Sequence, residues 1–529
     1  MTAGKKKVIM TLVTTVGLPA AWLGVAYLLQ EHWRTITVGR DTTFVTGPLR
    51  ADGTVDFVGA INARCSEGVT PENNAVVKLL PAIGTKDFLA TNARAMWFEL
   101  LGVPDVPDAP DHYVTFREFM KARAGKPKNV SEEDDWNQAW DAREDVREHA
   151  PWREGDDADM AAWIKRNEAA LGIAGEASRC ERFYSPLVGG GPNNDVLLEA
   201  QLPALGKYRT LNNGLTARTM MRLGAGDVAG YREDLLTTGR LGHLVMQGPT
   251  LIERLVGLAM VEQAYRSVEP ALGGRLKATE ARELLDTLRG LKPMPEMVEA
   301  VDQFERLIPL DIIAHVARYG PDCMGHTLDD PTLATRRVGL GLRVIPVRFD
   351  DVMRECNGLW DQHVMAARKP TYVERNAAFR EAEQARAAVA SRKEWDNLRK
   401  GLDSLEMVFE APSKPFARQD EVRMRERLAE LGLLLEIYRG AHGEYPETLE
   451  ALPKDEVRGA DEDFFSAGKM VYRREGSQAY VVYSVGRNAR DDGGKEPPRA
   501  TAATRGIFSR EVGPKADLPD DLVLRVSVK

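Results

Sequence analysis

The residues best suited to chemistry lie in a run rich in aspartate and glycine near the C-terminal end of the chain. Calcium prefers several oxygen ligands on a bendable loop, and glycines permit the tight backbone that points carbonyl groups inward. The run therefore predicts a calcium site, and the alternative is an ordinary solvated acidic turn. The residues expected to hold the ion are Asp491, Asp492, Gly493, Asp517, Asp520 and Asp521.

Alternating apolar residues predict the strands that must position this loop. Residues 470–472 and 480–484 read as two strands joined by a turn at 475–478, and residues 522–526 read as a third strand. A helix is expected over about 420–439, because Leu428, Leu431, Leu435 and Tyr438 recur three to four residues apart. The sequence thus predicts an α+β module in which an antiparallel sheet lies across one helix, with the acidic loop between the last two strands.

This order of parts, with the turn His442–Pro446 and the run Ser484–Gly494, resembles the C-terminal domain of the major pseudopilin of type II secretion systems. The resemblance covers residues 420–529 and implies that calcium orders the loop and stabilises the domain. Pseudopilins polymerise through a hydrophobic first helix that continues into the globular domain. Here the apolar segment lies about 390 residues upstream, so we do not expect this chain to polymerise in that way.

A second resemblance concerns the whole arrangement. The segments Val45–Leu49 and Gly53–Phe57, the run Thr70–Ala75 and the pseudopilin-like tail are similar to a family of large membrane-anchored planctomycete proteins. This resemblance implies no activity.

The N-terminus predicts a membrane anchor. Lys5, Lys6 and Lys7 precede an uncharged run over Val8–Leu29, which is long enough to cross a bilayer as a helix. A cleaved signal peptide is the alternative. Because the lysines come first, we expect a single-pass protein of the cytoplasmic membrane whose bulk is periplasmic or exoplasmic.

The region between the anchor and the module reads as mainly helical. One helix is expected to begin at Thr70–Glu72. The run 131–149 predicts a charged helix in which Trp136 and Trp140 share one face. Residues 217–231 resemble the helix, Gly-Asp turn, helix step of tetratricopeptide-type repeats, without a clean period. The fold class predicted is mainly α, an irregular solenoid-like array of helical hairpins, with the α+β module and one transmembrane helix.

These patterns divide the chain into five expected parts. They are the basic tip and anchor at 1–30, a helical exoplasmic region at 31–195, a helical-hairpin region at 196–370, a spacer of long charged helices at 371–414, and the pseudopilin-like domain at 415–529.

The chain contains no Gly-x-x-x-x-Gly-Lys-Ser/Thr phosphate loop, no His-Glu-x-x-His zinc motif and no Gly-x-Ser-x-Gly nucleophile turn. Its run Gly189–Asn194 lacks the strand and helix of a phosphate cradle and predicts a flexible loop, and eight histidines are scattered singly. A net charge of −8 makes nucleic acid an unlikely partner. Cys65, Cys180, Cys323 and Cys356 are either free thiols or disulfide-bonded, with three pairings open.

The sequence therefore predicts a membrane-anchored exoplasmic scaffold or protein-binding protein. The alternative is a hydrolase whose active site is assembled from distant residues of the helical region. A pocket that gathers a histidine and two acids would favour the enzyme, and a broad apolar and aromatic groove would favour the binding protein.

Overall fold

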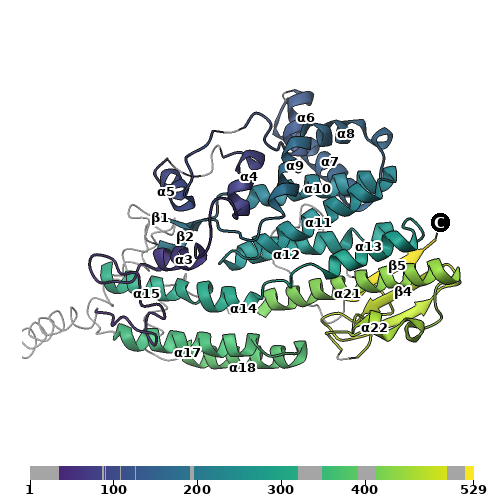
Figure 1. The fold of residues 1–529 in the computed structure, drawn as a ribbon. Helices are drawn as coiled ribbons and strands as arrows, with labels where there is room; N and C mark the ends of the chain where they lie inside the picture. Colours follow the sequence, from purple (N-terminus) through teal and green to yellow (C-terminus); the bar gives the residue numbers. More distant parts are fainter. Residues whose placement is uncertain are drawn as a thin grey trace, which may run out of the picture.

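The computed structural model describes residues 35–85, 89, 91–107, 109–125, 127–190, 196–319, 348–390, 413–466, 468–496 and 519–528. Within these ranges the fold is mainly helical, with a small sheet near the C-terminus (Figure 1). The predicted anchor, Cys323 and Asp517 lie outside the described residues. No helix in the described ranges is long and apolar enough to span a bilayer.

The N-terminal third is built from short helices. Trp136 and Trp140 lie on one face of the charged helix as predicted, with ring centroids 5.8 Å apart and Trp140 buried. The elements are α3 (Phe57–Cys65), α4 (Ala75–Ile83), α5 (Thr91–Leu101), α6 (Phe116–Ala124), α7 (Val130–His149), η2 (Glu154–Asp156), α8 (Ala158–Arg166) and α9 (Glu168–Ala177).

The predicted helix start at Thr70–Glu72 is wrong, because α4 begins only at Ala75 with Asn74 as its N-cap. The side chain of Asn74 accepts the N–H of Val76 at 3.1 Å, and its amide also exchanges hydrogen bonds with the backbone of Tyr184. That partner lies 110 residues away, so a local sequence pattern could not reveal it.

A glycine run predicted to be a flexible loop is partly a strand. Residues Val188–Gly190 form β1, which pairs antiparallel with β2 (Val196–Gln201). The prediction is therefore wrong for Gly189 and Gly190, while residues 191–195 lie outside the described residues.

The middle of the chain folds into long helices that pack one after another. The predicted Gly-Asp turn is confirmed: Gly226 ends α10 in the left-handed region and Asp227 caps α11. The elements are α10 (Leu205–Ala225), α11 (Val228–Val245), α12 (Leu251–Arg266), η3 (Glu269–Ala271), α13 (Ala278–Arg289), α14 (Met297–Ala300), η4 (Val301–Glu305) and α15 (Leu307–Tyr319).

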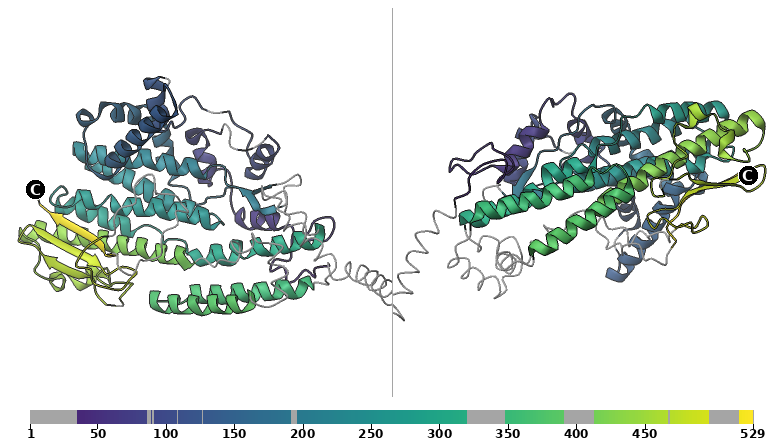
Figure 2. Two further views of the ribbon diagram at one scale, coloured as in Figure 1. Left: turned by 180° about the vertical axis from the view of Figure 1, so that it is seen from behind. Right: turned by 90° about the horizontal axis from the view of Figure 1, so that it is seen from below.

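Two further long helices precede the C-terminal module. Helix α17 (Phe349–Ala367) packs against α18 (Tyr372–Ala390), beside the row formed by α15, α14 and α21 (Figure 2). Residues Asp41 and Thr42 reach α17, where the side-chain amide of Asn357 donates to both of their carbonyls.

The C-terminal module consists of a helix and a three-stranded sheet. Helix α21 (Ser413–His442) is longer than predicted and is followed by η6 (Leu449–Ala451) and α22 (Lys454–Val457). Strands β3 (Val471–Arg474), β4 (Ala479–Ser484) and β5 (Leu522–Ser527) form the predicted antiparallel sheet. In it β4 lies between β3 and β5.

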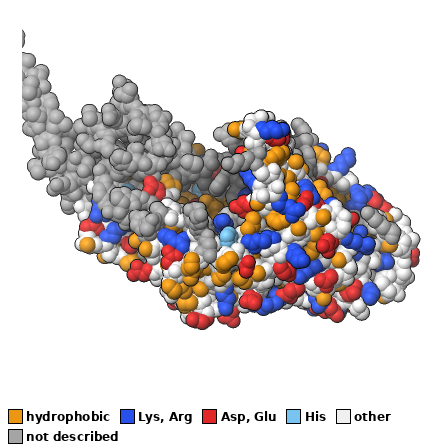
Figure 3. All heavy atoms as spheres, turned by 90° about the horizontal axis from the view of Figure 1, so that it is seen from above, with side chains coloured by type: hydrophobic (Ala, Val, Ile, Leu, Met, Phe, Trp, Pro, Cys, Tyr) orange, Lys and Arg blue, Asp and Glu red, His pale blue; other side chains and the backbone are white. Residues whose placement is uncertain are grey.

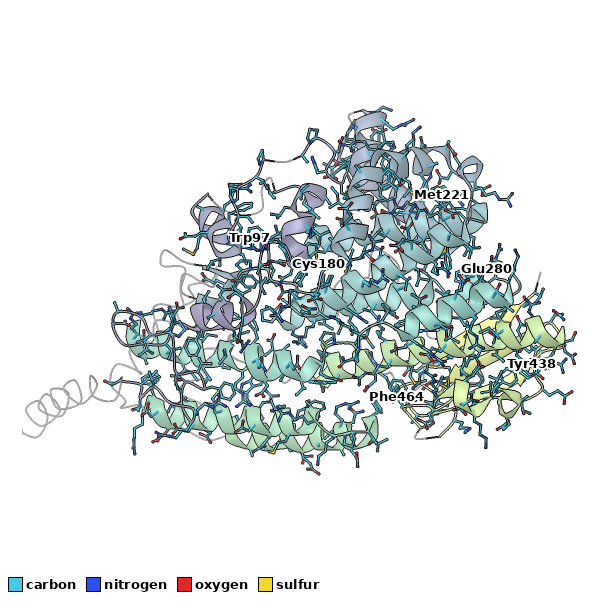
Figure 4. All side chains as sticks on the ribbon, viewed as in Figure 1. Trp97, Cys180, Met221, Glu280, Tyr438 and Phe464 are labelled. Atoms are coloured by element: carbon cyan, nitrogen blue, oxygen red, sulfur yellow. The ribbon has the colours of Figure 1, made fainter. Side chains whose placement is uncertain are left out.

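Helix α21 belongs to both the sheet and the helical region. One side packs on β4 and β5, and another packs on α12 and α13. Gly432 lies where the two meet, because a Cβ there would come within 2.6 Å of Leu272 and 2.9 Å of Leu524. Glu280 at the start of α13 and Tyr438 near the end of α21 lie at the same end of the molecule (Figure 4). Most of the buried apolar residues between Val55 and Val526 therefore form one connected core, and a small second cluster lies in the sheet.

Candidate functional site

The aspartate loop, residues 485–496, follows β4, and it folds back onto the residues that precede β5. Asp491 and Asp492 belong to the loop, and Asp520 and Asp521 lie directly before β5. Hydrogen bonds join these two segments, so the structure brings four of the predicted carboxylates and Gly493 into one region.

Asp521 anchors the loop. Its side chain is fully buried at 0% exposure, and its Oδ2 accepts the backbone N–H of Gly494 at 2.8 Å and of Lys495 at 3.3 Å. Its Oδ1 accepts the N–H of Asp492 at 3.4 Å. Hydrogen bonds from backbone amides to an ionised carboxylate are among the stronger ones, so Asp521 fixes the path of the glycine turn.

Asp492 and Asp520 join the two segments from the other side. The Oδ2 of Asp492 accepts the Nδ2 of Asn488 at 2.9 Å and the backbone N–H of Asp520 at 3.0 Å. The Oδ2 of Asp520 accepts the N–H of Asn488 at 3.3 Å. The backbone N–H of Arg487 also donates to the Asp520 carboxylate.

Asp491 holds the loop against the sheet. Its Oδ1 accepts the Tyr483 hydroxyl and the N–H of Gly493, both at 2.9 Å. Gly494 lies close to the same ring, since a Cβ there would come within 3.3 Å of it. The loop thus covers the small apolar cluster of Val481, Tyr483 and Val523 on the sheet face that α21 leaves open.

The backbone at the start of the loop requires glycine. Gly486 has φ +65°, and a Cβ at this position would lie 1.9 Å from the carbonyl oxygen of Asp520. The positive φ disfavours any L side chain at this position. The contact with the Asp520 carbonyl excludes a Cβ unless the backbone moves. The two segments therefore meet at backbone contact distance.

Burial and neighbouring charges act differently on the carboxylates of the site. Burial raises the pKa of Asp521, and burial together with the negative charge of Glu421 raises the pKa of Asp520. The side-chain hydrogen bond from Asn488 lowers the pKa of Asp492 instead. Burial and neighbouring negative charge both disfavour an ionised carboxylate, and a bound cation offsets both.

The described side chains of this region do not by themselves form a metal site. No group of three or more His, Cys, Asp or Glu side chains in the described residues is arranged to hold a metal ion. Calcium also accepts amide and backbone carbonyl oxygens, which Asn488 and the glycine turn can supply. The donors of this region are oxygens, which suit a hard cation rather than zinc.

Three residues of the site were not among the predicted ones. Asn488 and Tyr483 bind the loop carboxylates, and Gly486 permits the close contact between the two segments. The sequence feature that could have indicated them is the continuous run from Ser484 to Gly494, which contains Gly486 and in which the side-chain oxygen of Asn488 is a further possible metal ligand.

The described cysteines are free thiols. Cys65 and Cys180 are half-buried and Cys356 is buried. Burial raises the pKa of Cys356 to about 12, which keeps this thiol protonated and unreactive.

A second candidate region is a cleft of about 490 Å³ between β5, η3 and the ends of α7 and α12. Its charged lining residues are Glu148, His149, Arg266, Glu269, Arg275 and Arg525. The Nδ1 of His149 lies 2.7 Å from the carbonyl oxygen of Asp145, so it must carry the hydrogen and donate. The cleft gathers a histidine and two acids, and arginines accompany them.

Comparison with known proteins identifies no relative. No family model, no curated protein and no solved structure matches the chain. The resemblances to the pseudopilin domain and to the planctomycete proteins therefore stay predictions.

Proposed function

We propose that this chain is a membrane-anchored exoplasmic scaffold or binding protein whose pseudopilin-like C-terminal module is stabilised by calcium. The observation that carries the proposal is the closure of the aspartate loop by Asp492, Asp520 and Asp521 over the second face of the sheet. Asp521 is buried and Asp520 is partly buried. With Asp491 and Asp492 they make four acids on two segments, against three basic residues of the loop, Arg487, Arg490 and Lys495. A calcium ion would bind these acids and hold the segments together.

Each residue would have a distinct role toward the ion. Asp491, Asp492 and Asp520 would offer carboxylate oxygens, and the backbone of Gly493 would offer a carbonyl. Asp517 is the further carboxylate that the sequence predicts. Asp521 would position the loop through the backbone amides that it already accepts.

The helical region supports the scaffold part of the proposal. Helices α10, α11 and α12 pack consecutively, in the manner of a solenoid-like array of hairpins. The face seen in Figure 3 mixes basic and acidic side chains, without one dominant sign. The anchor and the exoplasmic orientation rest on the lysines before Val8 and on the apolar run that follows them.

Limited proteolysis of the full chain tests the calcium proposal. Trypsin cleaves after Arg487, Arg490 and Lys495, all within the aspartate loop. We expect millimolar calcium, but not magnesium, to slow cleavage at these three residues relative to chelator. Cleavage after Lys128, whose side chain is 86% exposed, serves as the control and should not change. Equal cleavage of the loop in calcium and in chelator would contradict the proposal.

A hydrolase remains the second candidate, and one observation favours it. The cleft beside β5 contains His149, Glu148 and Glu269. This alternative predicts turnover of a peptide or ester substrate that is lost in His149→Ala and retained in His112→Ala. If wild-type protein hydrolyses these substrates no faster than the His149→Ala variant does, the hydrolase alternative is wrong and the binding function is favoured.

A further inference from the structure

We propose that the free edge of β5 binds an extended acidic peptide of a protein partner, which adds to the C-terminal sheet as a fourth strand. The inference deepens the proposed binding function and rests on it. It assigns a place, a binding mode and a chemical class of partner to that function.

The register of the sheet decides which backbone groups of β5 face outward. Leu522, Leu524 and Val526 lie opposite Ser484, Val482 and Tyr480 of β4, and the N–H of Val528 donates to Gln478 at 2.9 Å. Successive residues of an antiparallel strand direct their backbone groups to opposite sides. Val523, Arg525 and Ser527 therefore direct their N–H and C=O groups away from β4.

Val523 confirms this direction and closes one end of the edge. Its carbonyl accepts Nη1 of Arg425 at 3.1 Å, and its N–H donates to Glu496 at 3.4 Å. At the other end Gly273 lies against the carbonyl of Ser527, because a Cβ on that glycine would come within 2.7 Å of the oxygen.

Between these two ends lie the backbone groups that an added strand could use. Among the described residues, nothing hydrogen-bonds to the N–H or C=O of Arg525 or to the N–H of Ser527. Both residues are exposed and line the 490 Å³ cleft. Unpaired groups on a strand edge are a template for another strand, and main-chain hydrogen bonds supply affinity in such additions.

The charge that selects the partner is that of Arg275. Three arginines, Arg266, Arg275 and Arg525, line it with two glutamates. Arg525 pairs with Glu475 and Arg266 with Glu262, whereas exposed Arg275 has no carboxylate partner among the described residues. An incoming strand with an acidic side chain beside Arg275 would complete this arrangement, and a basic one would be disfavoured.

The test measures fluorescence anisotropy of a labelled probe, acetyl-Thr-Val-Glu-Val-Glu-Val-Thr-amide, titrated with the full chain in calcium. We expect saturable binding of this probe. The affinity should fall by at least about tenfold when Lys replaces the two Glu residues of the probe, and likewise when alternate backbone nitrogens of the probe are methylated. Arg275→Glu should weaken binding of the acidic probe and strengthen binding of the lysine probe.

The decisive variant is Arg525→Pro, which removes one outward N–H from an edge strand, where proline is tolerated. Its matched control is Arg474→Pro, which removes an outward N–H from the opposite edge of the sheet, on β3. We expect at least a tenfold loss of affinity in the first variant and none in the second, with equal melting temperatures.

Three results would overturn the inference. The first is no binding at millimolar probe, and the second is equal binding of the probe by the two proline variants. The third is a dimer of the chain that Arg525→Pro abolishes, because a second copy of the chain would then occupy the edge. Calcium protection of the aspartate loop is measured separately. Failure of the peptide test with that protection intact would remove this inference alone.

Discussion

Gly486 is the residue at which the aspartate loop has least freedom. A Cβ here would meet the Asp520 carbonyl at 1.9 Å, whereas Gly443, with a similar φ of +79°, has nothing within 4 Å. We expect Gly443→Ala to cost about 1 kcal/mol, the typical penalty of a left-handed L residue. Gly486→Ala should cost about 3 kcal/mol or more, because it adds overpacking to that penalty. Chemical denaturation of both variants measures the difference, and equal costs would contradict the close approach of the two segments.

Glu253 is a buried acid whose charge depends on pH. Its carboxylate accepts the N–H and hydroxyl of Thr250 in a capping box, and burial raises its pKa from 4.5 to about 7. The folded state therefore holds a proton that the unfolded state releases, so this group's contribution to stability falls as pH rises from about 4.5 to about 7. The shift corresponds to about 3 kcal/mol.

We expect the free energy of unfolding of Glu253→Gln, relative to wild type, to rise by about 3 kcal/mol between pH 4.5 and pH 8. The matched control is Glu118→Gln, which changes an exposed glutamate in the same type of capping box, with Thr115. Urea denaturation at several pH values measures both variants. If Glu253→Gln leaves the pH dependence of the free energy of unfolding unchanged, Glu253 is ionised in the folded protein over this pH range.

At the scale of elements, α21 is the helix on which the module and the helical region depend. Glu436 lies on it at 0% side-chain exposure and accepts the backbone N–H of Gly273 at 2.8 Å and of Gly274 at 3.2 Å. It also accepts the Tyr445 hydroxyl and pairs with Arg439. One side chain thus joins the loop before α13 to the C-terminal module.

Glu436→Ala should cost about 3 kcal/mol or more, because it leaves the partly buried Arg439, two backbone amides and the Tyr445 hydroxyl without their acceptor. Glu447→Ala is the control, since that carboxylate is 86% exposed and its pair with Arg474 should contribute at most about 1 kcal/mol. Thermal unfolding followed by circular dichroism compares them. A cost below about 1 kcal/mol for Glu436→Ala would mean that the module is held mainly by other contacts.

The elements also show where sequence patterns were sufficient. The three strands of the antiparallel sheet and the turn at Gly226–Asp227 follow from local alternation and turn chemistry, and both agree with the prediction. The start of α4 was not, because Asn74 is fixed by Tyr184 far along the chain. The acids of the loop were predicted from their composition, whereas Asn488 and Tyr483 depend on how two segments and a strand meet in space.

For the whole molecule, the lysines before the apolar run predict the orientation in the membrane. A reporter fused after Lys529 should be active only outside the cytoplasm. Protease added to spheroplasts should digest the chain beyond residue 30, with a cytoplasmic protein as the control. Full protection of the C-terminal end would reverse the orientation.

Helix α21 packs on both the helical region and the module, so the two share one core. The effect of calcium should therefore be measured on the full chain. A ligand that binds only the folded state stabilises it by RT ln(1 + [L]/Kd), about 2.7 kcal/mol at a hundredfold excess over Kd. Calcium at the aspartate loop should therefore raise the melting temperature of the full chain.

The most direct measurement is thermal unfolding of the full chain in detergent micelles, in millimolar calcium and in chelator, with calorimetric titration of the ion. We predict a higher Tm in calcium and saturable binding, both lost in Asp491→Ala/Asp492→Ala, and both retained in Asp134→Ala/Asp135→Ala, a pair of exposed acids on α7. An unchanged Tm in wild type together with no heat of binding would contradict the account and leave the loop an ordinary acidic turn.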